Sequence, residues 1–165
     1  MKPLLNISLI LFAVLFLSCE KPEKTDLPKM EYVSYGGCKV STGNWMDSFG
    51  VSEDGLEYFV FGGFDSDFIQ GGTVNLPNER FHCLIAIYNQ KVDRCYEYIS
   101  DESVKEVWKC ESGTVEYSAT TDTLQNGEVK YNVNLIEGTF KNSQGNTASY
   151  SNKSISTNNI NWVVL

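Results

Sequence analysis

Alternation of apolar and polar residues gives the clearest structural signal in this chain. Val129, Tyr131, Val133 and Leu135 alternate with polar residues, and the segment 113–119 alternates in the same way just upstream. A period of two predicts half-buried β-strands. Because the residues between the two segments are rich in Thr, Asp, Asn and Gly, we expect a hairpin with a long loop.

More strand-like runs follow the same logic. The pattern resumes at 138–140, and the turn-forming residues 142–146 precede another run at 147–150, which predicts a second hairpin. Further predicted strands, bounded by glycine, asparagine or proline, are 31–35, 38–42, 56–61, 81–88 and 160–165.

The segment 100–109 fits two patterns. Val104, Val107 and Trp108 have helical spacing, but a hairpin that turns within 101–104 is also compatible with the residues. We favour the strand. With roughly eight to ten strands and no long helix, the sequence predicts an all-β domain, either a single antiparallel β-sandwich or a small, lipocalin-like β-barrel.

The first residues have the organisation of a secretory signal peptide. Lys2 is followed by the apolar stretch 7–17 and then by Ser18, a small residue directly before Cys19. The apolar stretch is shorter than the ~20 residues that a membrane-spanning helix needs. We therefore expect residues 1–18 to be a cleaved leader and the protein to be exported.

The segment 15–19, with the sequence Leu-Phe-Leu-Ser-Cys, resembles a lipobox, the site where bacterial lipoproteins are acylated and cleaved. It departs from the usual pattern at Phe16, where leucine is normal. The resemblance implies a palmitate-type lipid anchor on Cys19, and two or more acyl chains hold a protein stably to a membrane. Residues 19–30 are then an acylated, flexible tether, and 31–165 are the β domain. We expect an anchor in the cell envelope, at the outer membrane.

Charge narrows the possible partners. The formal net charge is −8, and lysine and arginine occur singly between acidic residues. Nucleic-acid binding requires clustered basic side chains, so the sequence argues against that class of partner. Aromatic residues make up 13% of the chain, which suits strands and also provides surfaces for binding.

The cysteines are consistent with export. Apart from Cys19 they form an even set, Cys38, Cys83, Cys95 and Cys110, which can pair as two disulfides in an oxidising compartment. Four cysteines allow three connectivities. If 100–105 forms a hairpin turn, Cys95 and Cys110 lie opposite each other, and Cys38 is left to pair with Cys83.

Acidic residues supply one candidate site. Asp65 and Asp67 lie in a glycine-rich segment, where an extended backbone would put both carboxylates on one side. Such a pair could ligate calcium or act as the acid and base of a glycoside hydrolase. The alternative is a solvated acidic loop, and the absence of the calcium-loop template Asp-x-Asp/Asn-x-Asp/Asn-Gly favours it.

The remaining chemistry is limited to aromatic side chains. His82 is the only histidine, so a histidine-based metal site would lack a second imidazole. His82 and Cys83 are neighbours in a strand and should point to opposite faces, which argues against a Cys–His nucleophile pair. We therefore expect no catalytic residue, metal or cofactor. Trp45 lies in a polar, loop-like stretch. It is the aromatic residue that we expect to stack on a sugar or to anchor a protein contact.

Four short segments carry a resemblance to a known group. The sequences at 112–117, 131–135, 137–140 and 145–146 resemble the C-terminal half of small uncharacterised lipoproteins of the Bacteroidota, which look all-β, either lipocalin-like or sandwich-like. The resemblance implies the anchor and the fold but no chemistry. We therefore expect a non-enzymatic, lipid-anchored module that binds a glycan or a protein. The alternatives are a lipocalin-like carrier of an apolar ligand and a carboxylate-based hydrolase.

Overall fold

The computed structural model describes residues 26–40, 45–92, 102–120 and 130–157. The predicted leader, Cys19, Cys95 and the predicted strand 160–165 lie outside these residues. Among the residues described, no helix has the length and apolar character needed to cross a membrane.

The described residues form eight strands and one short helix. In chain order they are β1 (Ser34–Val40), β2 (Trp45–Val51), β3 (Glu57–Phe64), α2 (Asp65–Gln70), β4 (Gly72–Leu76), β5 (Phe81–Tyr88), β6 (Val104–Thr120), β7 (Lys130–Asn142) and β8 (Thr147–Thr157). The predicted all-β class is confirmed.

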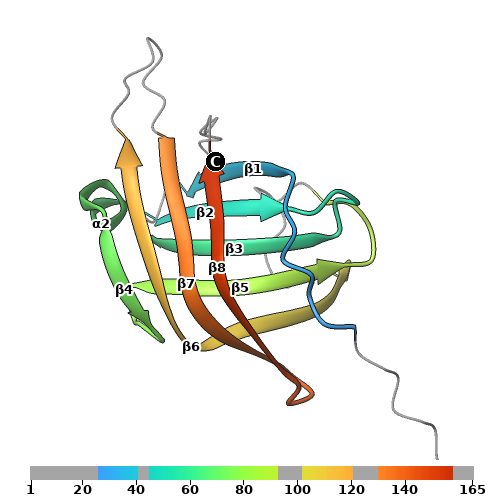
Figure 1. Ribbon diagram of the computed structural model, residues 1–165. Helices are drawn as coiled ribbons and strands as arrows, with labels where there is room; N and C mark the ends of the chain where they lie inside the picture. Colours follow the sequence, from blue (N-terminus) through green and yellow to red (C-terminus); the bar gives the residue numbers. More distant parts are fainter. Residues whose placement is uncertain (1–25, 41–44, 93–101, 121–129, 158–165) are drawn as a thin grey trace, which may run out of the picture.

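All eight strands belong to one antiparallel sheet. The strand order is β1-β2-β3-β5-β6-β7-β8, and β4 pairs with β6 outside this path. Figure 1 shows β6, β7 and β8 crossing in front of β2, β3 and β5. The sheet is therefore folded over, so that its two halves face each other across a common core.

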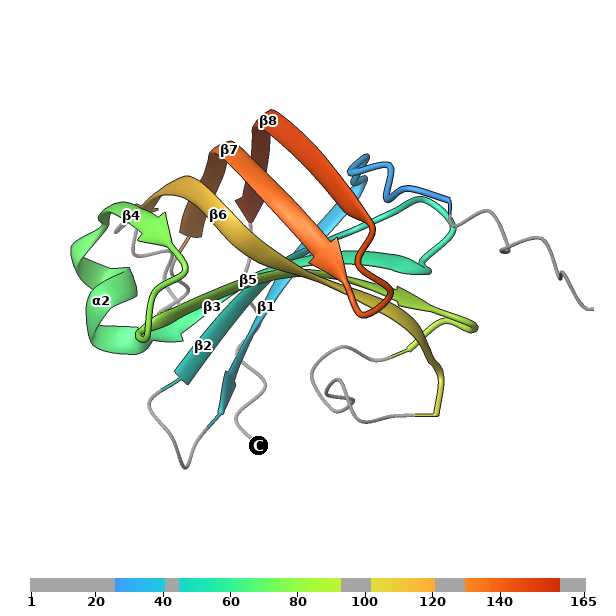
Figure 2. The same cartoon turned by 90° about the horizontal axis from the view of Figure 1, so that it is seen from below.

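The long strand β6 makes this fold possible. Its first part pairs with β5, whereas residues 113–117 pair with β4, and β7 follows its other edge. The pairing of β6 with β7 shifts register between Cys110 and Ser112 and again between Thr114 and Val115. Such β-bulges bend a strand and increase its twist. In Figure 2, β6 curves from the layer that contains β5 towards the layer that contains β7 and β8.

Large aromatic side chains fill the space between the layers. Phe59, Phe61 and Trp108 are fully buried on the inner face of the sheet. The rings of Phe61, Phe81 and Tyr117 lie with their centroids 5.1–5.7 Å apart. These rings pack against one another on the inner face of the folded sheet.

The opposite face of β3 and β5 is also apolar. Tyr58, Val60, Leu84, Ala86 and Tyr88 form a second buried cluster there. Because both faces of these strands are buried, their sequences are continuous apolar runs without alternation.

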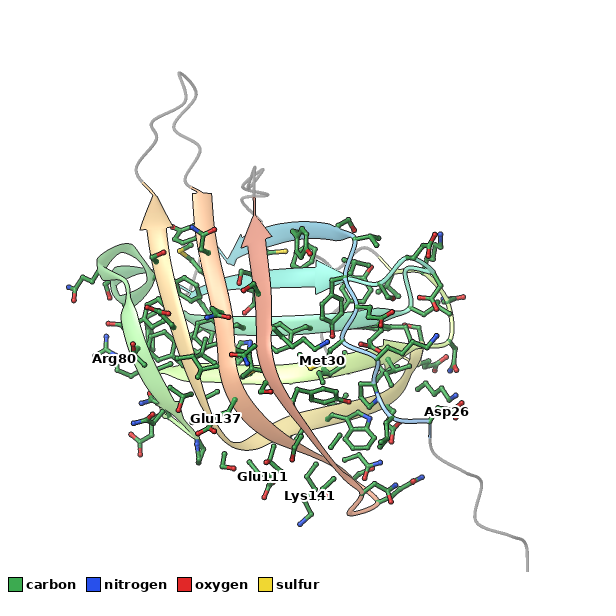
Figure 3. The ribbon with its side chains drawn as sticks, in the orientation of Figure 1. Asp26, Met30, Arg80, Glu111, Glu137 and Lys141 are labelled. Carbon is green, nitrogen blue, oxygen red and sulfur yellow. The ribbon has the colours of Figure 1, made fainter. Side chains whose placement is uncertain are left out.

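The N-terminal segment packs onto the domain before residue 31. Met30 is 2% exposed and belongs to the main core, and Figure 3 shows it between the two layers. The Glu57 carboxylate accepts hydrogen bonds from the Lys29 and Met30 N–H groups, both 2.8 Å, and from the Tyr32 hydroxyl at 2.9 Å. Met30 has a left-handed backbone (φ 52°), which lets the two consecutive N–H groups converge on the carboxylate. The packed domain therefore begins earlier than the predicted boundary at residue 31.

Two local predictions are wrong. Trp45 was expected in a loop, but it is the first residue of β2, where Trp45–Val51 pairs with β1 and β3. Asp65 and Asp67 were expected on an extended segment, but Asp65–Gln70 is the helix α2. The ambiguous segment near Trp108 is a strand from Val104 onward, as favoured.

Candidate functional site

A row of three residues crosses the outer face of the sheet, which is the face opposite the main core. In the register of β2, β3 and β5, Asp47 pairs with Gly62 and Gly62 pairs with His82. The side chains of Asp47 and His82 meet above the glycine, with Oδ1 and Nε2 3.1 Å apart. A Cβ atom on Gly62 would lie 2.0 Å from Asp47 Oδ1 and 2.6 Å from His82 Nε2. Gly62 is therefore required for this contact between non-adjacent strands.

Asp47 is a buried carboxylate, with 3% of its side chain exposed. Its Oδ1 accepts a hydrogen bond of 3.1 Å from the indole Nε1 of Trp45. The imidazole Nε2 of His82 lies at ion-pair distance from the same oxygen. A buried carboxylate needs such partners, because an uncompensated charge in the interior is costly.

Trp45 is held in a fixed orientation. Its ring stacks on the His82 ring at a centroid distance of 5.1 Å and an angle of 12°. Phe64, the residue paired with Trp45 across the strands, meets it edge-on at 5.1 Å. The indole hydrogen bond to Asp47 completes this constraint. Since Trp45 remains partly exposed, it presents a pre-oriented aromatic surface.

Polar groups border the aromatic residues. Phe64 is 36% exposed, and the Arg80 guanidinium lies 5.4 Å from the centroid of its ring. Arg80 also binds the carboxylate of Asp67 with two hydrogen bonds, of 2.7 and 2.8 Å. Figure 3 shows Arg80 projecting outward beside α2. We call Trp45, Phe64, Arg80, Asp67 and His82 the aromatic patch.

The structure thus brings together two of the three predicted binding residues. Trp45 and Asp67 border the same patch, connected through Phe64 and Arg80. The extended backbone on which the paired-carboxylate interpretation relied is absent, since 65–70 is helical. Both Asp67 oxygens are bound to Arg80, so this carboxylate is unsuited to act as a general acid. The pKa of Tyr117 is raised by burial and by the neighbouring charge of Asp67.

Asp47, Phe64 and Arg80 were not singled out from the sequence, and His82 was considered only for catalysis. Their signal is not local, because the cluster forms through pairing between β2, β3 and β5. The alternation within β5 could place His82 on the face opposite Cys83, and the structure confirms that placement, since Cys83 belongs to the main core. Among the described residues, no group of three or more histidine, cysteine, aspartate or glutamate side chains could hold a metal ion.

A second candidate is a cleft of about 490 Å³ at the end of the domain where the N-terminal segment enters. Lys29 and Lys105 line it together with acidic and small polar residues. Glu106 accepts a hydrogen bond from the buried Asn142 amide at the base of the β7–β8 hairpin. The charges of opposite sign are interspersed, and Glu57 is already engaged with the N-terminal segment. This cleft therefore shows less specialisation for a ligand than the aromatic patch.

The cysteines do not pair as predicted. Cys83 and Cys110 are free thiols, so neither the Cys38–Cys83 nor the Cys95–Cys110 bond is present. Cys38 is disulfide-bonded, and its partner is neither of these two. The reason lies in the register: the strand opposite 104–109 is β5, not a segment that contains Cys95.

No protein family, curated protein or solved structure matches this chain.

Proposed function

We propose that this protein is an exported, lipid-anchored and non-enzymatic module of the bacterial envelope, and that its aromatic patch binds a glycan. The observation that carries the proposal is the fixation of Trp45 by His82, Phe64 and the buried Asp47. A rigid, partly exposed ring loses little conformational entropy when a ligand binds.

The composition of the patch suits a sugar. Aromatic rings supply apolar contact area, and the neighbouring Arg80 and Asp67 supply donors and acceptors for hydroxyl groups. A few fixed polar groups beside aromatic surface are typical of small-molecule sites. The acidic net charge of −8 disfavours anionic polymers, so a neutral or basic glycan is the class that fits.

The binding test compares two substitutions of exposed apolar residues. Full-length chain carrying Cys19→Ser would be titrated calorimetrically with neutral and amino-sugar oligosaccharides. Trp45→Ala should weaken binding about 5- to 150-fold, since loss of one stacked ring is worth about 1–3 kcal/mol. Ile136→Ala is the matched control, because Ile136 is a 38% exposed apolar residue on β7, which is not adjacent to β2 in the sheet. Its binding should equal that of the parent.

Equal binding by the Trp45→Ala variant would contradict the site. If no oligosaccharide binds, and the parent chain captures an envelope protein that the Trp45→Ala variant does not capture, the ligand is a protein and not a glycan.

The anchor has a separate test. Cys19→Ser should release the protein from the membrane fraction of its host, because the acyl chains supply the attachment. A variant that still fractionates fully with membranes would contradict the lipid anchor and leave the glycan test unaffected.

A further inference from the structure

The two free cysteines of the described residues, Cys83 and Cys110, lie on the neighbouring strands β5 and β6. The antiparallel register of these strands ends at the pair Leu84–Lys109, and Cys83 and Cys110 are the next residues of the two strands. The two thiols lie near enough for each to shift the pKa of the other. Both side chains belong to the main core, where Cys83 is 6% exposed and Cys110 is partly buried.

This arrangement meets the geometric demands of a disulfide. Directly opposed residues in an antiparallel pair have Cα atoms about 4.5–5.5 Å apart, within the range of about 4.4–6.8 Å found for bridged cysteines. Alternation along each strand puts both side chains on the inner face, since Cys83 shares the core with Ile85 and Cys110 packs against the core beside Trp108.

The two thiols differ in reactivity. The hydrogen bond from the Cys83 thiol lowers the pKa of Cys110, and the Ser112 backbone contributes in the same direction. Burial raises the pKa of Cys83 well above its usual range. Because the thiolate is the nucleophile, Cys110 is the residue that reacts first with an external disulfide, and Cys83 is positioned to resolve the product.

We propose that Cys83 and Cys110 form a cross-strand disulfide in the exported protein. The export itself is part of the proposed function. The oxidant is an external disulfide, either a dithiol–disulfide oxidoreductase or oxidised glutathione. The Cys110 thiolate attacks one sulfur of that disulfide, which breaks its S–S bond, forms a mixed disulfide and releases one thiol. Cys83 then loses its proton and attacks Cys110 Sγ, which releases the second thiol. Two electrons pass from the cysteine pair to the external disulfide.

Trypsin offers a direct test, because it separates the four cysteines of the β domain. Cleavage after lysine and arginine places Cys83 in 81–91 and Cys110 in 110–130, with the other two in 30–39 and 95–105. The reduced full-length chain would be incubated with oxidised glutathione, alkylated and digested without reductant. A linked species of 81–91 with 110–130, lighter by two hydrogens than the sum of the peptides, is the expected result.

Linkage of either peptide to 30–39 or 95–105, or full alkylation of both cysteines after oxidation of the folded chain, would overturn the proposal. A thermal melt provides a second readout. Oxidised protein should lose roughly 5 °C or more of melting temperature when Cys110 is replaced by Ala. Under reducing conditions the same replacement should have a much smaller effect. An equal loss under both conditions would mean that only packing is involved.

Thiol trapping in cells separates this proposal from that of export. If the bond forms in glutathione buffer but both thiols are free in the cell, the result would contradict export of the protein. The Cys83–Cys110 pairing would still be supported.

Discussion

Two buried carboxylates lie on opposite faces of the same pair of strands, and they are used differently. Glu57, on the inner face at the start of β3, is bound by two backbone N–H groups and the Tyr32 hydroxyl. Asp47, on the outer face near the end of β3, is bound by the Trp45 indole and lies beside the His82 imidazole. The donors to Glu57 belong to the N-terminal segment and fasten it to the domain, whereas the partners of Asp47 carry a partly exposed aromatic surface.

The Glu57 contacts hold the N-terminal segment in place, and the Asp47 contact holds the Trp45 ring. Two of the three hydrogen bonds to Glu57 come from backbone N–H groups and the third from the Tyr32 hydroxyl. Burial raises the pKa of Tyr32, and the Glu57 charge raises it further. Next to them, Tyr150 donates a hydrogen bond to the Pro28 carbonyl, and burial raises the pKa of Tyr150 to about 12. By contrast, the Trp45 and His82 side chains beside Asp47 are partly exposed.

Removal of the Glu57 carboxylate should have the largest effect. Glu57→Ala leaves the Lys29 and Met30 N–H groups without an acceptor, and the variant should lose about 3 kcal/mol of unfolding free energy. Urea denaturation measures the loss. Glu53→Ala, an exposed turn residue, is the matched control and should change stability by less than about 0.5 kcal/mol. Similar stability of both variants would contradict the fastening role.

Adding a side chain at Gly62 should have the next largest effect. The Cβ of Gly62→Ala would overlap the Asp47 carboxylate, and overpacking of this kind costs about 1–3 kcal/mol. In an Asp47→Ala background the same change should cost less, because the nearest overlapping atom has gone and only the His82 ring, 2.5–2.6 Å from the added Cβ, remains in the way. Additive losses in this double-mutant cycle would mean that the glycine is required for another reason.

Replacement of Trp45 should affect binding more than folding. Trp45→Ala removes one stacked ring contact, one edge-on ring contact and the indole hydrogen bond to the buried Asp47, so we expect a loss of about 1–2 kcal/mol in stability. Chemical denaturation gives this value, and the calorimetric titration gives the loss of affinity. A stability loss as large as that of Glu57→Ala would mean that Trp45 mainly stabilises the fold.

The smallest expected effect concerns an exposed carboxylate. Hydrogen bonds from the Ser52 hydroxyl and the Leu56 N–H lower the pKa of Asp54. Because the folded pKa is lowered, this stabilisation is present above the unfolded pKa and is lost as the pH falls through the folded pKa, below about pH 4. Asp54→Asn should remove only a few tenths of a kcal/mol at pH 7 and nothing near pH 2, measured by urea denaturation at both values. A larger loss at pH 2 would contradict the sign.

Local patterning was sufficient for much of the fold. The alternation at Tyr131, Val133 and Leu135 predicted the buried face of β7, and the apolar run 81–88 matches β5. These predictions succeed because a strand with one buried face must alternate and a strand buried on both faces must be apolar throughout. The signal organisation ahead of Cys19 is likewise a property of the sequence alone, and it remains a prediction.

Only the tertiary structure decided which residues meet. A short helix such as α2 has little intrinsic stability, and it forms here because Phe68 is buried among the rings of Phe61, Phe81 and Tyr117. Strand order puts Cys83 and Cys110 on neighbouring strands and brings Asp47 to His82 over Gly62. Pairing partners depend on the free energy of burying whole strands against each other, so no local pattern of residues encodes them.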